Sequence, residues 1–428
     1  MDSIRAIKGT QDLLPDSIGL WHHIESVSQA ILANAGYSEI RTPIFEKTDL
    51  FVRGIGTATD VVSKEMYSFT TRGDDAITLR PENTAGVARS FIQHKLYAAG
   101  DVQKLWYRGP MFRYERPQAG RQRQFHQLGL ESLGSSDPRA DAEAIAVAVD
   151  ILKALGLSTL TVSINSVGRG DDRTVYRDAL IDYLTPFKAE LDTDSQDRLT
   201  RNPLRVLDSK DPRTREIVAD APKLIDHLSP ESKEHFDRVL LQLQQLGIDY
   251  AIDHKLVRGL DYYTHTAFEI QSNDLGAQNA VCGGGRYDGL VAELGGPETP
   301  AVGWAMGLER IAILLQQQGF STQSRLDAYA ISRGRAAEDA ALAIVQELRQ
   351  AGIATGLDLS GGKFSKQFKR ADRSGATWAL VLGDEEVSRN VVQIKHLQSG
   401  EQMEVSRSEL ASFLRQPLDC SPSLADTL

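Results

Sequence analysis

The sequence predicts an α+β protein with a large domain built on a mostly antiparallel sheet, a helical insertion within that domain, and a smaller C-terminal α/β domain. Three observations support this prediction. At 428 residues, the chain is long enough for about two or three domains. In its first part, candidate strands follow one another without the helical crossover that a parallel sheet needs. Beyond residue 326, strand and helix patterns alternate regularly, which is typical of an α/β domain.

Composition and charge exclude several classes of protein. The chain has 48 basic and 58 acidic side chains, giving a net charge of −10, so it does not coat nucleic acid through bulk positive charge. Local basic patches remain possible. The only cysteines, Cys282 and Cys420, cannot form a disulfide framework or a four-thiolate zinc site, and we predict no protein-held metal. No segment has the pattern of a secretory signal or of a membrane span, so we expect a cytoplasmic protein.

The first 100 residues predict two helix–strand pairs. Residues 16–35 have apolar side chains at helical spacing, and residues 37–45 form a strand-like run. Pro43 lacks the N–H that a central strand needs, so this strand should lie at an edge or an interface. Residues 76–80 indicate a strand that leads into a helix at 83–97.

Residues 102–114 and 124–133 predict two strands joined by a polar loop, which together form an antiparallel hairpin. The region at 171–246 is polar and helix-like, and we interpret it as a helical insertion in a large first domain that spans residues 1–325. The other elements predicted in this domain are a helix at 137–155 and strands at 160–165, 248–253, 266–271 and 299–306.

The C-terminal α/β domain is predicted at residues 326–415, after a polar linker at 317–326 and before a frayed tail at 416–428. Its helix at 363–373 carries five basic side chains and one acidic side chain, which suggests a surface for a nucleic-acid backbone. A solvated helix face is the alternative. The domain's predicted strands are 328–332, 353–359, 378–382 and 391–397, with a second helix at 336–350.

The predicted hairpin loop is rich in arginine. Its sequence, RYERPQAGRQRQFHQ at 113–127, holds four arginines and one acid, a local charge of 4 − 1 = +3. Arginine presents a planar fork of donors that suits phosphate oxygens. A solvated basic loop is the alternative, but Arg113 follows an apolar pair, where a charge needs an anionic partner.

Four other stretches suggest a binding site. In LVRGLDYY (256–263), Arg258 and a tyrosine pair could contact a ligand, or an Arg–Asp pair could cover a tyrosine core. The triple glycine at 283–285 could cradle a ligand or form a flexible turn. Arg310 lies near a predicted helix start, where a phosphate is favoured. The alternative is a packed strand–helix corner with a surface arginine. Glu82 and Thr84 could bind an amino group or merely begin a helix.

Taken together and in order, these stretches resemble the class II aminoacyl-tRNA synthetases, and specifically the bacterial histidyl-tRNA synthetase family. The Pro43 strand, the arginine hairpin and residues 301–314 are similar to the three class motifs. LVRGLDYY and GGGRYDGL (283–290) are similar to the two histidine-specific motifs. The resemblance runs from KGTQDLLP (8–15) through the C-terminal domain.

The resemblance implies a histidine–tRNA ligase. Such an enzyme activates L-histidine with ATP to histidyl-adenylate and pyrophosphate, then transfers histidine to the terminal ribose of its tRNA. It implies a homodimer and Mg²⁺ held mainly by the phosphates. A carboxylate and a tyrosine hydroxyl on the two ring nitrogens would select histidine by roughly 10⁴-fold or more over analogues, so no editing domain is expected.

The resemblance also implies a role for particular residues. Arg113 and Arg258 would hold the α-phosphate of ATP, Arg121 and Arg310 the distal phosphates, and Glu115 the adenine amino group. Glu82, Thr84 and Gln127 would bind the α-amino group of histidine, while Glu131, Tyr262 and Tyr263 would contact its imidazole. Arg113, Arg258 and Gln127 would be the catalytic residues. Arg116 and Gln118 would touch the tRNA acceptor end, and the C-terminal domain would read the anticodon. Lys366, Lys369 and Arg370 of that domain would contact the tRNA backbone.

The sequence departs from the family pattern in three places. Asn83 stands where the family usually has glycine, Thr264 and His265 replace a more usual Asn-Arg pair, and residues 54–60 lack a common acid. Asparagine tolerates left-handed backbone, so the turn at Asn83 could survive.

Two alternatives stay open at this point. One is the histidine-sensing regulatory subunit of ATP phosphoribosyltransferase, which shares the catalytic fold; the intact arginines and the C-terminal domain argue against it. The other is a glycyl or prolyl synthetase, against which LVRGLDYY argues.

Overall fold

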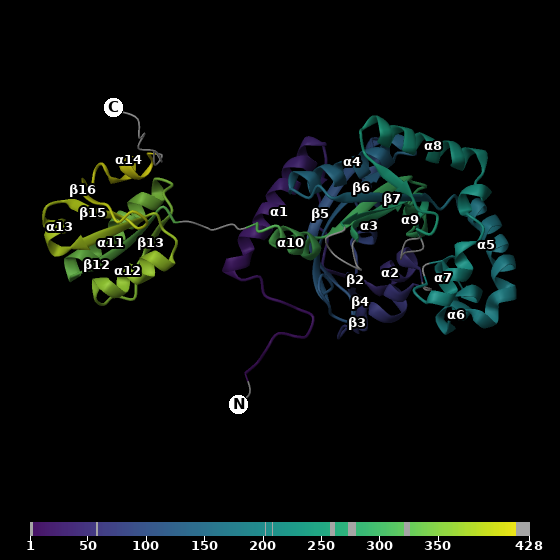
Figure 1. The fold of residues 1–428 in the computed structure, drawn as a ribbon, viewed down its shortest axis with the longest axis horizontal. Coiled ribbons are helices and arrows are strands. Elements are labelled where there is room, and N and C mark those ends of the chain that lie inside the picture. The colour runs from purple at the N-terminus through teal and green to yellow at the C-terminus, as the bar shows by residue number, and fades with distance from the viewer. Residues whose placement is uncertain are drawn as a thin grey trace, which may run out of the picture. The chain divides into compact units, whose positions relative to one another are not determined.

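The structure is a computed structural model that describes residues 3–56, 59–201, 203–207, 209–256, 262–272, 280–320 and 326–416. The chain divides into two compact units, Met1–Ser321 and Thr322–Leu428. The predicted α+β class is confirmed: the first unit holds a large mixed sheet with helices, and the second is a small α/β unit (Figure 1). Among the residues described, no helix combines the length and the apolar character needed to cross a bilayer.

Eight strands form the main sheet of the first unit, in the order β1-β5-β6-β11-β10-β9-β7-β8. Its inner pairs are antiparallel, while the two end pairs, β1–β5 and β7–β8, are parallel. The predicted antiparallel character therefore holds except at the ends. The strands are β1 (Ser38–Glu39), β5 (Gln103–Phe112), β6 (Gln124–Leu133), β7 (Leu160–Ser166), β8 (Tyr250–Ile252), β9 (Thr264–Ser272), β10 (Ala280–Arg286) and β11 (Ala301–Gly307).

The predicted hairpin is confirmed. Strands β5 and β6 pair without interruption from Gln103 opposite Leu133 to Phe112 opposite Gln124. Because the register is continuous, the arginine-rich residues 113–123 are confined to the loop that connects the two strands. This places their side chains at one end of the main sheet, beside the start of α10 (Leu308–Gln317).

Alternating side chains divide the sheet into two faces, as the two-residue period of a strand requires. Trp106 packs into the larger core with α1 (Pro15–Asn34), α4 (Pro138–Ala154), α8 (Pro230–Gln245) and α10. Its neighbour Tyr107 faces the opposite side, where α3 (Thr84–Gln93) and α9 (Leu290–Glu293) cover a smaller core. The smaller core contains Tyr262, Tyr263 and Tyr287, so an aromatic floor lies on this face.

Between β7 and β8, the described residues form a helical body with its own apolar core. Asp172 joins its entry and exit, since the carboxylate accepts hydrogen bonds from the Ser229 backbone and the Ser232 hydroxyl. The helices before α8 are α5 (Gly170–Leu184), α6 (Thr193–Arg201) and α7 (Pro212–Ala219), with short 3-10 turns at Thr185–Glu190, Pro203–Val206 and Leu224–His227.

A small antiparallel sheet, β2-β4-β3, lies beside the main sheet and is preceded and followed by irregular chain. Two predictions need correction here. The predicted strand at 37–45 is split into β1 and β2. The Ile40 N–H still donates to the Trp106 carbonyl of β5, but residues 41–44, which include Pro43, belong to neither strand. The predicted helix at 83–97 ends at Gln93, since Lys95 takes a left-handed φ of 52°. The elements are β2 (Phe45–Lys47), α2 (Thr48–Ile55), a π-helical turn (Val61–Glu65), β3 (Tyr67–Thr70), β4 (Ala76–Leu79) and a 3-10 turn (Leu96–Ala99).

The triple glycine is not a turn, and that alternative was wrong. Gly283, Gly284 and Gly285 lie inside β10 and pair with both β9 and β11. A Cβ on Gly284 would overlap the Gly303 carbonyl, and one on Gly285 would overlap the Thr266 carbonyl. Glycine is needed here because neighbouring backbones approach too closely for a side chain.

The second unit has a five-stranded sheet in the order β13-β12-β14-β15-β16, and its predicted strand–helix alternation is confirmed. Two elements, α13 and β16, were not predicted. Of the predicted tail, residues 417–428 lie outside the described residues, as do 321–325 of the predicted linker. The elements are β12 (Ala328–Arg333), α11 (Arg335–Gln350), β13 (Thr355–Leu357), α12 (Phe364–Arg373), β14 (Trp378–Gly383), α13 (Asp384–Ser388), β15 (Val391–His396), β16 (Gln402–Ser406) and α14 (Leu410–Leu414).

Candidate active site

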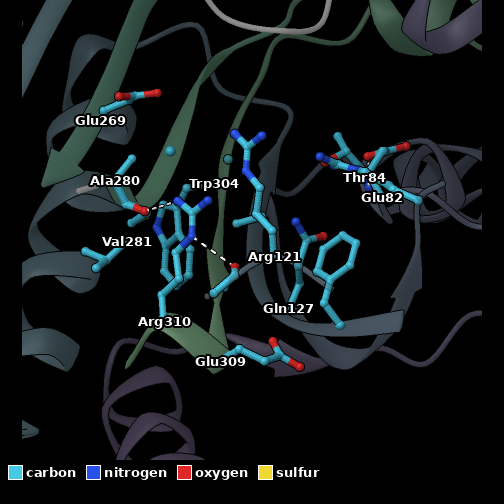
Figure 2. A pocket seen from close by; sticks show the side chains of 18 of the residues that line it. Glu82, Thr84, Arg121, Gln127, Glu269, Ala280, Val281, Trp304, Glu309 and Arg310 are labelled. Carbon is cyan, nitrogen blue, oxygen red and sulfur yellow. Dashed lines mark hydrogen bonds between the residues drawn. The ribbon is translucent and has the colours of Figure 1, made fainter. Parts of the chain in front are cut away.

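A cavity of about 280 Å³ opens on the smaller-core face of the main sheet. Its walls come from the start of α3, the β5–β6 hairpin, strands β9, β10 and β11, and the start of α10. Figure 2 shows Glu82 and Thr84 toward one side of the cavity and Arg310 with Glu269 toward the other, with Arg121 and Gln127 between them. The cavity thus has an acidic end and a basic end.

Three arginines from two distant stretches of chain line this cavity. Arg113 donates from Nε to the Pro81 carbonyl at 2.8 Å, and its guanidinium lies over the Phe125 ring at 5.3 Å. Arg310 donates to the carbonyls of Gly120 and Ala280, as the dashed lines in Figure 2 mark. Burial and the nearby charge of Arg121 lower the pKa of Arg310. Repulsion among these cations would be relieved by a polyanion such as a triphosphate.

Glu115 is one of the acids that lie at this basic end, with Glu269 and Glu309. Its carboxylate is 3.2 Å from Arg121 and 4.0 Å from Arg113. The contacts orient Glu115 and also leave the two guanidinium groups with donors to spare, since each has five N–H donors.

The opposite end is built on the first turn of α3. The Glu82 carboxylate accepts hydrogen bonds from the backbone N–H groups of Thr84 at 2.6 Å and Ala85 at 3.1 Å, and burial raises its pKa. Gln127 on β6 lines the same cavity, and its buried side-chain carbonyl has no hydrogen-bond partner. An orphaned buried acceptor of this kind fits a ligand that brings an N–H donor.

Glu131 lies beneath this end and is fully buried. Its carboxylate accepts hydrogen bonds from the Thr84 hydroxyl at 2.7 Å and from the Tyr287 hydroxyl at 2.5 Å. Burial raises the pKa of Glu131 to about 8, although both hydrogen bonds oppose the rise. Gly303 makes room for it, because a Cβ there would overlap the Glu131 carboxylate.

Tyr262 and Tyr263 line the cavity next to Glu131. Their rings lie 4.7 Å apart, and Tyr262 meets Tyr287 edge-on at 5.6 Å. Burial raises the pKa of Tyr262, so its hydroxyl remains a donor at neutral pH. The three tyrosine rings form a recess with flat apolar walls, and their hydroxyl groups supply its polar atoms.

The remaining predicted site residues lie elsewhere. Arg258 falls outside the described residues. Arg116 and Gln118 belong to the hairpin loop, where Gln118 pairs with Arg121 through two backbone hydrogen bonds, and neither side chain lines the cavity. On α12, Lys366 and Lys369 are exposed, whereas the Arg370 guanidinium is bound to Asp358 at 2.6 Å.

The described departures from the family pattern have structural roles. Asn83 precedes α3 and accepts a hydrogen bond from the Thr42 hydroxyl; its φ of −125° shows that it does not use the left-handed backbone considered from the sequence. Thr264 accepts a hydrogen bond from the Asp288 backbone. His265 takes a left-handed φ of 47° and stacks on His235 at 4.6 Å. Of residues 54–60, Thr57 and Ala58 lie outside the described residues.

Several lining residues were missed from the sequence. Tyr287 is part of GGGRYDGL (283–290), in which the three glycines gave the stronger local signal. Glu309 stood next to Arg310; it is buried and accepts hydrogen bonds from the backbone N–H of His126 at 2.9 Å. Tyr107 and Glu269 carried no local signal beyond strand alternation.

Comparison with known proteins shows the family of the chain. A family model described as histidyl-tRNA synthetase matches residues 9–172 and 186–311, and one described as an anticodon binding domain matches residues 327–417. A histidine–tRNA ligase of a Picosynechococcus species is 63% identical, covering 97% of this chain and 97% of that protein. The apo histidyl-tRNA synthetase of S. aureus has a TM-score of 0.82 and 38% identity, covering 97% of this chain and 100% of that one. A Nostoc histidyl-tRNA synthetase has a TM-score of 0.67 at 21% identity, which supports the fold alone.

The sheet, the arginine-lined cavity and the C-terminal α/β unit define a class II aminoacyl-tRNA synthetase. Within that class, the chain belongs to the histidyl-tRNA synthetase family. Its activity is that of a histidine–tRNA ligase, an enzyme that uses ATP to charge tRNA with histidine.

Proposed function

We propose that the cavity binds ATP at its arginine end and histidine at its Glu82 end, and that histidyl-adenylate forms between them. The observation that carries this proposal is the convergence of Arg113 and Arg121 from the hairpin with Arg310 from α10, in the cavity whose other end lies above the buried Glu131. A triphosphate at the basic end would bring its α-phosphate toward the amino-acid end of the same cavity.

In the first step, the histidine carboxylate attacks the α-phosphate in line and pyrophosphate leaves. We assign Arg113 and Arg258 to the α-phosphate, Arg121 and Arg310 to the distal phosphates, and Glu115 to the adenine amino group. Catalysis rests on positioning and on stabilising the charge that develops on phosphate oxygens, since the step needs no protein nucleophile.

Histidine would be held by its two polar ends. We assign its α-amino group to Glu82, Thr84 and Gln127, of which Gln127 offers an unpaired acceptor. Its imidazole would enter the tyrosine-walled recess. Glu131 and a tyrosine hydroxyl would then meet the two ring nitrogens, and an analogue without them would leave buried polar groups unpaired.

Transfer to tRNA would use both units. We propose that residues 1–325 form the catalytic domain, with Arg116 and Gln118 touching the acceptor end, and that residues 326–415 bind the anticodon. The exposed Lys366 and Lys369 suit phosphate contacts. Arg370 pairs with Asp358, so its guanidinium also stabilises the fold of this unit, in addition to any contact with tRNA.

Mg²⁺ would be held mainly by the phosphates of ATP, which offer the hard oxygen ligands it prefers. Cavity carboxylates are already engaged: Glu115 with Arg121, and Glu309 with the His126 backbone. The protein would act in the cytoplasm.

We also propose a homodimer. Ile44, Phe45 and Phe69 expose apolar side chains around the small sheet, next to Pro43. A second copy of the chain would cover them. Sedimentation analysis tests this proposal, and a monomer at micromolar concentration would contradict it.

The central experiment is ATP–pyrophosphate exchange with each amino acid in turn. Exchange with histidine alone, followed by charging of histidine tRNA, supports the proposal. Exchange with another amino acid would indicate a synthetase of different specificity, and histidine binding without exchange would indicate a regulatory protein.

A further inference from the structure

The segment KGTQDLLP at 8–15 carries part of the family resemblance, yet none of it lines the cavity. Residues 3–8 are exposed, and Ile4 and Ile7 are among the large apolar side chains left in solvent. A segment that buries so little apolar surface contributes little to folding through the hydrophobic effect. Its role must come from the contacts it does make.

The contact that matters joins Gly9 to the arginine hairpin. The Gly9 carbonyl accepts hydrogen bonds from the backbone N–H groups of Arg123 at 2.7 Å and Gln124 at 3.2 Å. A turn supports it, because Thr10 donates from its backbone and its hydroxyl to the Ile7 carbonyl. The segment is therefore tied to the point where β6 begins.

Gly9 also lies directly against the Arg123 side chain. A Cβ on Gly9 would meet Arg123 Cγ at 2.8 Å, and the backbone there has a left-handed φ of 89°. Any other residue would face both the contact and the unfavourable φ. The close approach presses the aliphatic stem of Arg123 into one position.

Arg123 in turn contacts the loop that lines the basic end of the cavity. Its guanidinium lies over the Tyr114 ring at 4.0 Å, and its Nε donates to the Glu115 carbonyl at 3.3 Å. Its own carbonyl accepts from the Arg113 backbone at 2.9 Å. Arg123 itself does not line the cavity, but the residues it holds, Arg113 and Glu115, do.

We propose that Gly9 is a positioning residue for ATP. It holds Arg123 against Tyr114 and thereby fixes Glu115 at the basic end of the cavity, where the adenine would bind. This inference rests on the proposed function, because it takes Glu115 to face the adenine amino group. It predicts an effect on ATP that histidine does not share, since among the described residues no hydrogen bond joins residues 8–15 to Glu82, Thr84 or Gln127.

The test is Gly9→Ala in the full chain, measured by ATP–pyrophosphate exchange. We expect the KM for ATP to rise roughly tenfold, within the range seen for coupling between contacting residues, and the KM for histidine to stay within twofold. Preference for ATP over purine riboside triphosphate, which lacks the amino group, should fall by a similar factor. An unchanged KM for ATP, or an equal rise for histidine, overturns the proposal.

Two further variants separate positioning from backbone strain. Gly36→Ala is the matched control, because Gly36 has a φ of 78° with no atom within 4 Å of an added Cβ; it should leave the KM for ATP unchanged. In an Arg123→Ala background, Gly9→Ala should lose most of its effect on the KM for ATP, since Cγ and Cδ of Arg123 and its guanidinium are then absent. Equal effects in both backgrounds would overturn the proposal.

If Gly9→Ala does not fold, Arg123→Ala alone carries the test, with the same expected rise in the KM for ATP and the same overturning result. Failure of the proposed function would look different, because the unaltered protein would then show no histidine-dependent exchange.

Discussion

The Tyr287 hydroxyl donates a hydrogen bond to the Glu131 carboxylate at 2.5 Å, across 156 positions of sequence. The Thr84 hydroxyl donates to the other oxygen. Even with these two donors, burial raises the pKa of Glu131 to about 8, which favours the protonated form of this group near neutral pH. A protonated acid beneath a recess for imidazole can share its proton with the substrate.

The first prediction concerns the pH dependence of histidine binding. Below about pH 6.5 free imidazole is protonated and must release a proton to share one with Glu131. Above pH about 8 free Glu131 is ionised and must take up a proton. The KM for histidine should therefore be lowest between these values and should rise up to about tenfold per pH unit beyond them.

Glu131→Gln provides the control for this profile. Glutamine cannot titrate, so the ratio of the variant's KM for histidine to that of the native enzyme should be constant below pH about 8 and fall above it. Taking the ratio cancels titration of the substrate's own groups. A ratio that stays level up to pH 9.5 would show that Glu131 does not share a proton with histidine.

The second prediction concerns the converging arginines. Arg113→Ala and Arg310→Ala should each lower kcat/KM in exchange by about 10²-fold, the usual size for a positioned donor to developing charge. Arg201→Ala is the control, because Arg201 forms an exposed ion pair on α6. A near-native rate in either cavity variant, with the control also unaffected, would remove that arginine from the ATP site.

The third prediction concerns acid stability. Burial, with His235 and Arg286 nearby, lowers the pKa of His265 to about 4, below its unfolded value of about 6.5. The unfolded state binds a proton first, so stability is complete above pH about 6.5 and falls as pH decreases toward about 4, by at most about 3 kcal/mol. Asp141 and Arg169 also face this group.

Urea unfolding at several pH values measures this loss. His265→Asn is the informative variant, since asparagine tolerates the left-handed φ of 47° and does not titrate. Its free energy of unfolding should change less between pH 6.5 and 4 than that of the native protein. Identical pH dependence would place the acid sensitivity at another residue.

The fourth prediction separates the basic residues of α12. Lys366→Ala and Lys369→Ala should weaken tRNA binding and reduce the slope of log Kd against log salt by about 1 for each lost phosphate contact. Exchange should not change. Arg370→Ala should instead lower the free energy of unfolding of the C-terminal unit, because the buried Asp358 loses its charged partner. If the lysine variants left the salt slope unchanged, α12 would not be a tRNA surface.

The hairpin shows how far local pattern reaches. Strands β5 and β6, and the arginine-rich connection between them, were predictable because alternation and charge can be seen within a few residues. The arginine hairpin and residues 301–314 likewise pointed to Arg113, Arg121 and Arg310, all of which line the cavity. The triple glycine is just as easy to see in the sequence. Its place inside β10, however, depends on the close approach of the Gly303 and Thr266 carbonyls, which no local pattern reveals.

The sequence by itself determined the domain types, the hairpin, the basic connection and the family resemblance, because periodicity, charge and motif order are properties of nearby residues. Only the tertiary structure decided that Tyr287 completes the shell around Glu131, that Glu309 braces His126, and that Gly9 presses on Arg123. Each of these is a contact between segments far apart in the chain. Such contacts depend on burial and close packing around the whole sheet, so no single stretch of sequence specifies them.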